Sequence, residues 1–257
     1  MKTPIPAPLR PAVLLAALAA ALLGPAPTAS AEEVLSATEI LRRADKVMSA
    51  PRDQDSHVTL VLLDKDGNRK ERTLRMYQKG ADTRMARFLT PADQKGISVL
   101  SLPDGSIYLY LPAYQKVKRI ASSVKNSSFA GTDFTYEDME ARNYAESYGA
   151  ELLRTEAECW VLQLTPKPGT SGDWARLLMW VRRDNAIPIT VEYYDARGTL
   201  KRRLTSERLE QIGGYWVARE RVMHDITKNH RSRMIIDKAV FDSGLSDEIF
   251  TTRYLER

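Results

Sequence analysis

The sequence contains very few of the residues that build disulfide frameworks and zinc sites. Among 257 residues there are one Cys and three His. A single Cys cannot form an internal disulfide, and His57, His224 and His230 have neither H-E-x-x-H spacing nor companion cysteines. Cys159 lies in an apolar run and is expected to be a small core residue. We therefore predict no metal and no other cofactor.

The sequence also lacks the short motifs of common enzyme classes. It has no G-x-S-x-G elbow, no G-x-x-x-x-G-K-[ST] phosphate loop and no G-x-G-x-x-G dinucleotide motif. Adjacent carboxylates, such as Glu137 with Asp138 and Asp247 with Glu248, point in different directions and are more typical of helix caps than of acid/base pairs. We predict that the protein is not an enzyme, and a hydrolase is the disfavoured alternative.

The first 31 residues differ in composition from the rest of the chain. Lys2 and Arg10 precede an uncharged apolar run at residues 12–23, and Ala29-Ser30-Ala31 supplies an A-x-A site. This order is typical of a secretory signal peptide. The run is shorter than the roughly 20 residues that a membrane-spanning helix needs, although an uncleaved anchor helix remains the alternative. We predict cleavage near Ala31, one domain at residues 32–257 and a periplasmic location.

Removing the predicted signal peptide lowers the net positive charge of the protein. The formal net charge of +5 includes Lys2 and Arg10, so the 226 residues after position 31 carry +3. A chain of this length buries roughly 70% of its unfolded surface and needs no disulfides. The basic clusters at 116–119 and 201–203 are typical of solvated edge strands, and attraction to anionic lipid headgroups or to an acidic partner domain is the alternative. We predict no nucleic-acid partner and leave peripheral membrane contact open.

One helix at the start of the domain is followed by many strands. Ser36 and Glu39 have capping-box spacing, and apolar residues recur at helical spacing up to position 48. From residue 57 the period changes to two, and about a dozen runs are separated by turn residues. The turn at 64–68 resembles half a calcium loop, but Arg69 and Lys70 stand where acidic ligands would follow. The pattern predicts an antiparallel meander.

Residues 121–139 interrupt the meander. This segment lacks a period of two and is long for a connection, and a short helix is expected within 133–140. Long connections of this kind are usually lids, binding loops or linkers. We predict that four bulky side chains in it form a lid over a binding site: Phe129, Phe134, Tyr136 and Met139.

Several predicted strands are apolar on both faces. The runs at 99–102, 107–111, 160–162 and 177–181 show no alternation with polar residues. Both faces of these strands must therefore be sheltered from water. One helix can cover one face. The other requires a curling sheet, the 121–139 segment, a second chain or a ligand, unless the strands belong to an ordinary sandwich core without a cavity.

The most specific motif is the run S-F-x-G-[ST]-D-F-[ST]-Y-E-D at residues 128–138. Together with Y-L-Y-L-P at 108–112, K-V-K-R-I at 116–120, E-Y-Y-D at 192–195 and the ending at 241–250, it resembles the bacterial outer membrane lipoprotein-sorting protein family, a LolA-like branch of periplasmic carriers. The resemblance covers the chain from about residue 36 to the end.

The resemblance implies a mainly β (α+β) fold: a strongly curved antiparallel sheet forming an incomplete barrel, with an N-terminal helix and a short helical plug or lid. It also implies an apolar interior for lipoprotein acyl chains or another lipid. An inner-membrane transporter, RND-type or lipoprotein-releasing, would be a partner. Arg75, Arg84 and Arg87 are candidates for a gating arginine, and nothing in the sequence chooses among them.

We therefore hypothesise a non-enzymatic periplasmic carrier that binds an acyl chain in an apolar cavity for transfer toward the outer membrane. A periplasmic sensor or adaptor that partners an RND-type exporter or a signalling protein is the alternative. A one-residue slip in register exchanges the two faces of a strand, so the cavity-facing residues depend on the register. The predicted cavity residues are Leu100, Leu102, Tyr108, Tyr110, Leu162, Leu164 and Met179.

Overall fold

The structure is a computed structural model, and it describes Met1 and residues 35–140, 143–170 and 173–257. Apart from Met1, the predicted signal peptide and its cleavage point near Ala31 lie outside the described residues. Residues 35–257 form one compact unit. Within the described ranges, no helix is long and apolar enough to cross a membrane.

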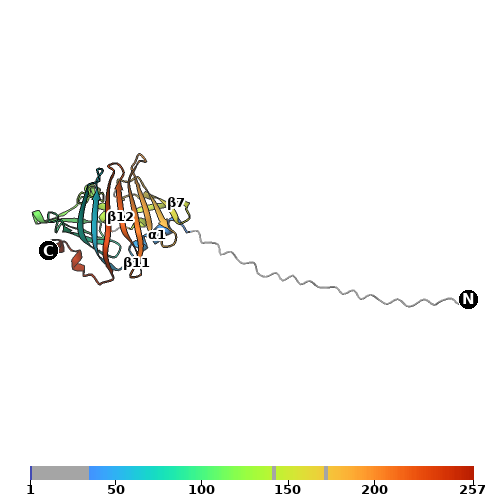
Figure 1. Cartoon of the computed structure of the whole chain (residues 1–257), viewed down its shortest axis with the longest axis horizontal. Coiled ribbons are helices and arrows are strands. Elements are labelled where there is room, and N and C mark those ends of the chain that lie inside the picture. The colour runs from blue at the N-terminus through green and yellow to red at the C-terminus, as the bar shows by residue number, and fades with distance from the viewer. Residues whose placement is uncertain (2–34, 141–142, 171–172) are drawn as a thin grey trace. The chain divides into compact units, whose positions relative to one another are not determined.

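Most of the described chain is β-structure (Figure 1). The first half contains α1 (Ala37–Met48), β1 (Asp53–Leu63), β2 (Arg69–Lys79), β3 (Thr83–Thr90), β4 (Ser98–Ser101), β5 (Ile107–Leu111), η1 (Pro112–Tyr114) and β6 (Lys116–Arg119). The connection that follows contains η2 (Ser122–Val124), η3 (Glu137–Met139) and α2 (Tyr144–Ser147). The second half contains β7 (Tyr148–Thr155), β8 (Cys159–Pro166), β9 (Arg176–Arg182), β10 (Pro188–Tyr194), β11 (Leu200–Ile212), β12 (Tyr215–Asp225), β13 (His230–Phe241), η4 (Asp247–Phe250) and α3 (Thr252–Leu255).

The thirteen strands form one antiparallel sheet in the order β6-β5-β4-β3-β2-β1-β13-β12-β11-β10-β9-β8-β7. Each half of the chain is a meander, and the two halves join where β1 pairs with β13. Within the described part of the chain, β6 and β7 pair with no further strand, so the sheet is an open one. The predicted fold class, a curved antiparallel sheet that is not closed and that has an N-terminal helix, is confirmed.

The connection between β6 and β7 joins the two edges of the sheet. Because these edges lie at opposite ends of the strand order, the connecting segment has to pass across one face. On that face its Phe129 and Phe134 join a core that also contains Ile40 and Leu41 of α1. We call this the inner face. Figure 1 shows α1 near the β7 end of the sheet, where the contacts of α1 with β7 and β9 place it.

The helix α1 forms as the sequence predicts. The Ser36 hydroxyl accepts a hydrogen bond from the backbone N–H of Glu39 at 3.2 Å, which satisfies one of the free donors at a helix start. Ile40, Leu41 and Ala44 are fully buried against the inner face of the sheet. The helix therefore covers part of the face that the sheet alone leaves apolar.

The opposite, outer face carries a second apolar cluster at β2–β5. Tyr77, Met85 and Leu100 pack there against Phe250 and Leu255 of the C-terminal segment. This segment, residues 245–255, is the cover that the strands with two apolar faces require at this end of the sheet. The sequence patterns did not predict that this segment would cover the outer face.

A short helical turn directly precedes β7. Residues Tyr144–Ser147 form the helical turn α2, and the strand starts at Tyr148. The cause is Asp45 of α1, whose carboxylate accepts hydrogen bonds from the backbone N–H groups of Tyr144 at 3.0 Å and Ala145 at 2.7 Å. These groups are the free donors of a helix N-terminus, so a tertiary contact stabilises the turn.

Candidate functional site

A cavity of about 190 Å³ lies on the inner face of the sheet. Its lining comes from both halves of the chain, with Arg84 on β3 and Val191 on β10 among the contributors. These strands are six positions apart in the strand order, so the sheet must curve strongly to bring them to one cavity. Bulges, including the one between His57 and Val58 on β1, bend and twist such strands.

Flexible apolar side chains make up much of the lining. Five of the eight methionines in the sequence contribute to it. Methionine is unbranched and polarisable, so a surface rich in it adapts to ligands of different shape. Trp216, near the turn between β11 and β12, also lines the cavity and is 37% exposed. The methionines concerned are Met48, Met76, Met139, Met223 and Met234.

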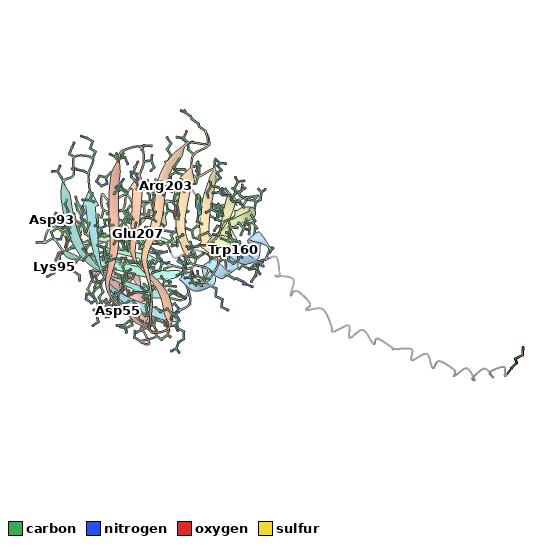
Figure 2. All side chains as sticks on the ribbon, turned by 45° about the vertical axis from the view of Figure 1, so that its right-hand side comes forward. Asp55, Asp93, Lys95, Trp160, Arg203 and Glu207 are labelled. Carbon is green, nitrogen blue, oxygen red and sulfur yellow. The ribbon has the colours of Figure 1, made fainter. Side chains whose placement is uncertain are left out.

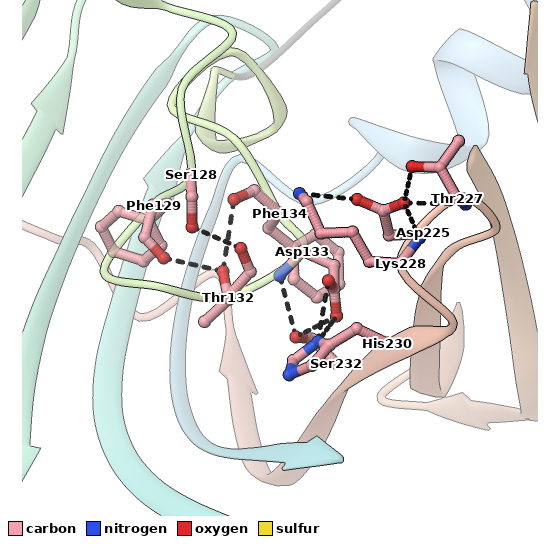
Figure 3. Close-up of polar contacts among 10 residues, drawn as sticks. All are labelled: Ser128, Phe129, Thr132, Asp133, Phe134, Asp225, Thr227, Lys228, His230 and Ser232. Carbon is pink, nitrogen blue, oxygen red and sulfur yellow. Dashed lines mark hydrogen bonds and ion pairs between the residues drawn. The ribbon is translucent and has the colours of Figure 1, made fainter. Parts of the chain in front are cut away.

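The segment 121–139 is fastened to the inner face by Asp133 (Figure 3). The Ser232 hydroxyl of β13 accepts a hydrogen bond from the backbone N–H of Asp133 at 2.9 Å and donates one to its carboxylate at 2.7 Å. His230 Nδ1 lies 2.7 Å from the same carboxylate. Hydrogen bonds to an ionised group are the stronger kind, so Asp133 holds the segment firmly.

The Asp133 cluster contains the residue types of a catalytic triad in a different arrangement. In a triad the His lies between the acid and the Ser, and takes the proton from the Ser. Here Asp133 lies between Ser232 and His230, and the Ser232 hydroxyl points to the carboxylate. This arrangement stabilises the segment and does not activate Ser232 as a nucleophile.

Two further contacts hold the same segment. The carboxylate of Asp138 pairs with Arg202 of β11, and the guanidinium lies 5.2 Å from the centre of the Tyr193 ring. Burial alone would lower the pKa of Arg202, but the charge of Asp138 raises it above its ordinary value. Arg72 of β2, which is also buried, donates to the carbonyl oxygen of Ala130. The segment is therefore attached to β2, β11 and β13.

Two arginines contribute charge to the cavity. Arg84 of β3 and Arg221 of β12 both line it. Burial, followed by the nearby charge of Arg221, lowers the pKa of Arg84 to about 10. Burial likewise lowers the pKa of Arg221. The other two candidate gating arginines lie elsewhere: Arg75 pairs with Asp55, and Arg87 packs over Tyr254.

The predicted cavity residues fall into two groups. Leu162, Leu164 and Met179 belong to the main core on the inner face. The other four, Leu100, Leu102, Tyr108 and Tyr110, belong to the cluster beneath the C-terminal segment on the outer face. None of the seven is among the residues that line the 190 Å³ cavity. Their contact with a lipid stays a prediction.

The predicted lid residues lie together on the inner face. Phe134 and Met139 line the cavity. Phe129 stacks on Phe88 with 5.5 Å between ring centroids and meets Tyr136 edge to face at 5.7 Å. Phe129 and Tyr136 thus pack behind the two residues that reach the cavity, and the movement of this segment as a lid stays a prediction.

The sequence patterns did not identify Met223, Met234 and Arg221 as lining residues. Met223 and Met234 lie in strands that alternate with polar residues, and Arg221 lies in a strand dominated by charges. The alternation itself was a signal, since Arg221 and Met223 share a face of β12. On β11 the same alternation puts Leu204 and Ser206 in the lining and Arg203 and Glu207 on the outer face (Figure 2).

Metal-ligating groups are not gathered at this site. In residues 35–140, 143–170 and 173–257, no group of three or more His, Cys, Asp and Glu side chains is placed to hold a metal ion. Cys159 is buried, and burial raises the pKa of its thiol, which disfavours the reactive thiolate.

Several solved structures share this fold. A domain from Vibrio parahaemolyticus named for outer membrane lipoprotein sorting is 26% identical, with a TM-score of 0.79 over 86% of this chain and 98% of its own. A DUF1329 family protein from Desulfovibrio piger is 26% identical, with a TM-score of 0.80 over 85% and 97%. A LolA superfamily protein from Nitrosomonas europaea, at 22% identity and a TM-score of 0.72 over 86% and 99%, shares the fold.

Sequence comparison gives the remaining assignment. No curated protein matches the sequence. A family profile described as "-like: Uncharacterized protein" matches residues 80–257, which is more than half of the chain. The chain therefore belongs to the family of this profile, and its structural relatives are consistent with a LolA-like protein of the outer membrane lipoprotein-sorting kind.

Proposed function

We propose that the protein is a non-enzymatic periplasmic carrier that binds the acyl chain of a lipoprotein or another lipid in the cavity on the inner face. The observation that carries this proposal is the lining: a curved sheet and a fixed segment surround a space whose walls are mostly methionine, aromatic and aliphatic side chains. An acyl chain gains about 0.8 kcal/mol for each CH₂ group removed from water, so an apolar cavity binds it without covalent chemistry.

The cavity is small for a whole acyl chain, so a carrier function requires it to expand. Pockets for small-molecule ligands usually measure roughly 300–1,000 Å³, and this one measures about 190 Å³. A whole acyl chain therefore requires the walls to move apart. Since the segment 121–139 is attached at three places, we propose that the end of α1, with Val47 and Met48 in the lining, gives way first.

The name of the Vibrio parahaemolyticus relative supports lipoprotein sorting as the context. In that context the carrier would receive its cargo from an inner-membrane transporter, of the lipoprotein-releasing or RND type, and pass it toward the outer membrane. The predicted signal peptide would place the protein in the periplasm.

A pair of tryptophan variants tests the proposal. Ser206→Trp puts a large ring into the cavity, and Glu207→Trp puts the same ring on the outer face one residue later in β11. We expect purified wild-type protein and Glu207→Trp to bind radiolabelled palmitate, and Ser206→Trp to bind at least about tenfold more weakly, the equivalent of 1.4 kcal/mol. Equal binding by both variants, or no uptake by the wild type, would contradict the carrier.

A further inference from the structure

Arg84 and Arg221 line one cavity although they are far apart in the sequence and in the sheet. They lie on β3 and β12, four positions apart in the strand order, and both line the same cavity. Arg84 shares the inner face with Ala86 and Phe88, and Arg221 shares it with Met223. The curvature of the sheet thus brings two guanidinium groups to one apolar space.

In the described part of the chain, neither guanidinium is within ion-pair distance of a carboxylate. Arg84 donates hydrogen bonds to neutral oxygens, the Gln78 side-chain carbonyl at 2.8 Å and, more weakly, the Glu140 backbone carbonyl at 3.4 Å. The two acidic side chains that line the cavity are engaged elsewhere: Asp138 with Arg202 and Glu140 with Lys125.

Three arginines on the outer face, in contrast, are paired with carboxylates. Arg75 pairs with Asp55, Arg203 with Glu192 and Arg233 with Glu220. Each of these three arginines has a carboxylate partner although it is also partly exposed to water, whereas no ion pair is found for either cavity arginine among the described residues. A general excess of positive charge on the protein would not explain why the two cavity arginines lack carboxylate partners while the three on the outer face have them.

Placing two guanidinium groups at one cavity carries an electrostatic cost. A buried cation loses hydration, and a second cation nearby adds repulsion. Both effects act on Arg84, whose pKa they lower to about 10, and burial acts on Arg221. One anion between the two groups would reverse both effects, since guanidinium groups bind carboxylate and phosphate oxygens through paired, charge-assisted hydrogen bonds.

We propose that Arg84 and Arg221 together bind the acidic group, a carboxylate or phosphate, of an anionic amphiphile whose acyl chain lies against the methionine-lined wall. The inference rests on the proposed function and narrows the cargo to a lipid with an acidic group. Met223 on β12 and Met234 on β13 extend the apolar wall beside Arg221. The site for the acidic group therefore adjoins the surface that would contact the first carbons of the acyl chain.

Matched ligands test this assignment on the purified protein freed of bound lipid. Palmitate and 1-hexadecanol have the same chain length and differ in charge, and 1-palmitoyl lysophosphatidate replaces the carboxylate by a phosphate. Inorganic phosphate supplies the anion without a chain. The variants are Arg84→Gln and Arg221→Gln, and Arg197→Gln removes the same charge from an exposed turn as a control.

We expect the wild type to bind palmitate and the lysophosphatidate at least about tenfold more tightly than hexadecanol. Each cavity variant should lose about tenfold in affinity for the acidic ligands and keep its affinity for hexadecanol, which also shows that it is folded. Arg197→Gln should bind all three like the wild type.

The contrary results distinguish failure of the arginine assignment from failure of the carrier function on which it rests. Equal affinities of the wild type for hexadecanol and palmitate, or unchanged palmitate binding in both cavity variants, would overturn the assignment of the arginines and leave the carrier standing. Binding of inorganic phosphate without binding of any chain would replace the amphiphile by a free anion. No binding of any of the three lipids would overturn the carrier itself.

Discussion

Asp133 and Ser232, 99 positions apart in the sequence, form two hydrogen bonds: the Ser232 hydroxyl accepts one from the Asp133 backbone N–H and donates one to the Asp133 carboxylate. Asp133 belongs to the segment that joins the two edges of the sheet, and Ser232 is fully buried on β13 near the middle of the strand order. This contact fixes Phe134, the next residue, where it lines the cavity.

Replacing Asp133 by Ala should therefore destabilise the protein. The change removes an ionised acceptor from buried Ser232 and from His230, and we expect a loss of about 3 kcal/mol in the free energy of unfolding. Urea unfolding measures the loss, and hydrogen exchange should accelerate in residues 121–139. Asp66→Ala, in an exposed turn, is the control, and a loss no larger than in this control would refute the role of Asp133.

Replacing Arg221 and Arg202 by methionine should change the free energy of unfolding in opposite directions. Arg221→Met removes a cation without a carboxylate partner from the described cavity lining, and should raise the unfolding free energy of the lipid-free protein by about 1 kcal/mol. Arg202→Met leaves the Asp138 carboxylate without its partner and should lower it by about 3 kcal/mol. Thermal unfolding of both variants checks the signs. A loss of stability in Arg221→Met would mean that this charge is compensated in the empty protein.

The Asp45 carboxyl should make stability fall as the pH rises. Burial, only partly offset by hydrogen bonds from Ala145 and Tyr144, raises the pKa of Asp45 from 3.8 to about 6. The folded protein then holds the proton more tightly than the unfolded chain, so this contribution is present below pH 4 and is lost as the pH rises through about 6. A shift of this size corresponds to at most about 3 kcal/mol.

Asp45→Asn checks this contribution, because the amide does not titrate. Urea unfolding of the wild type and the variant at pH 4, 5, 6 and 7 should show the difference in stability changing between pH 4 and 6. Parallel pH profiles for the two proteins would contradict the raised pKa.

The Asp53 carboxylate should act with the opposite sign at lower pH. Burial alone would raise its pKa, but hydrogen bonds from Ser243, Leu245 and Gly244 hold the pKa below its usual value. This contribution to stability is present above the unfolded pKa near 3.8 and is lost as the pH falls through the lower, folded one.

Because Asp53 holds the start of the C-terminal segment, Asp53→Asn should loosen that segment at neutral pH. We expect faster hydrogen exchange in residues 245–255 and a shallower loss of stability between pH 4 and 2 than in the wild type. Unchanged exchange in this segment would show that Asp53 does not hold it.

Local patterns predicted much of the fold. The capping residues Ser36 and Glu39 located the start of α1, and the period of two located most strands, because both signals depend on near neighbours in the sequence. The turn at Asp64 formed as expected, with its carboxylate accepting hydrogen bonds from Asp66 and Asn68.

Contacts between distant residues account for what the patterns did not predict. The helical turn at Tyr144 depends on Asp45, and the cover over Leu100 depends on Phe250. The strands at 99–102 and 107–111 are apolar on both faces, so their sequence could not say which face meets the cavity. Arg84 and Arg221 line the same cavity only because the whole sheet curves, and local sequence patterns do not predict that curvature.

Photo-crosslinking with a fatty acid that carries a diazirine on its acyl chain tests the central claim most directly. If an acyl chain occupies the cavity on the inner face, crosslinks should fall on Met76, Met223 and Met234, and Ser206→Trp should strongly reduce them while Glu207→Trp leaves them unchanged. Crosslinks confined to the cluster of Leu100 and Tyr108 on the outer face, or crosslinks undiminished in Ser206→Trp, would contradict the account.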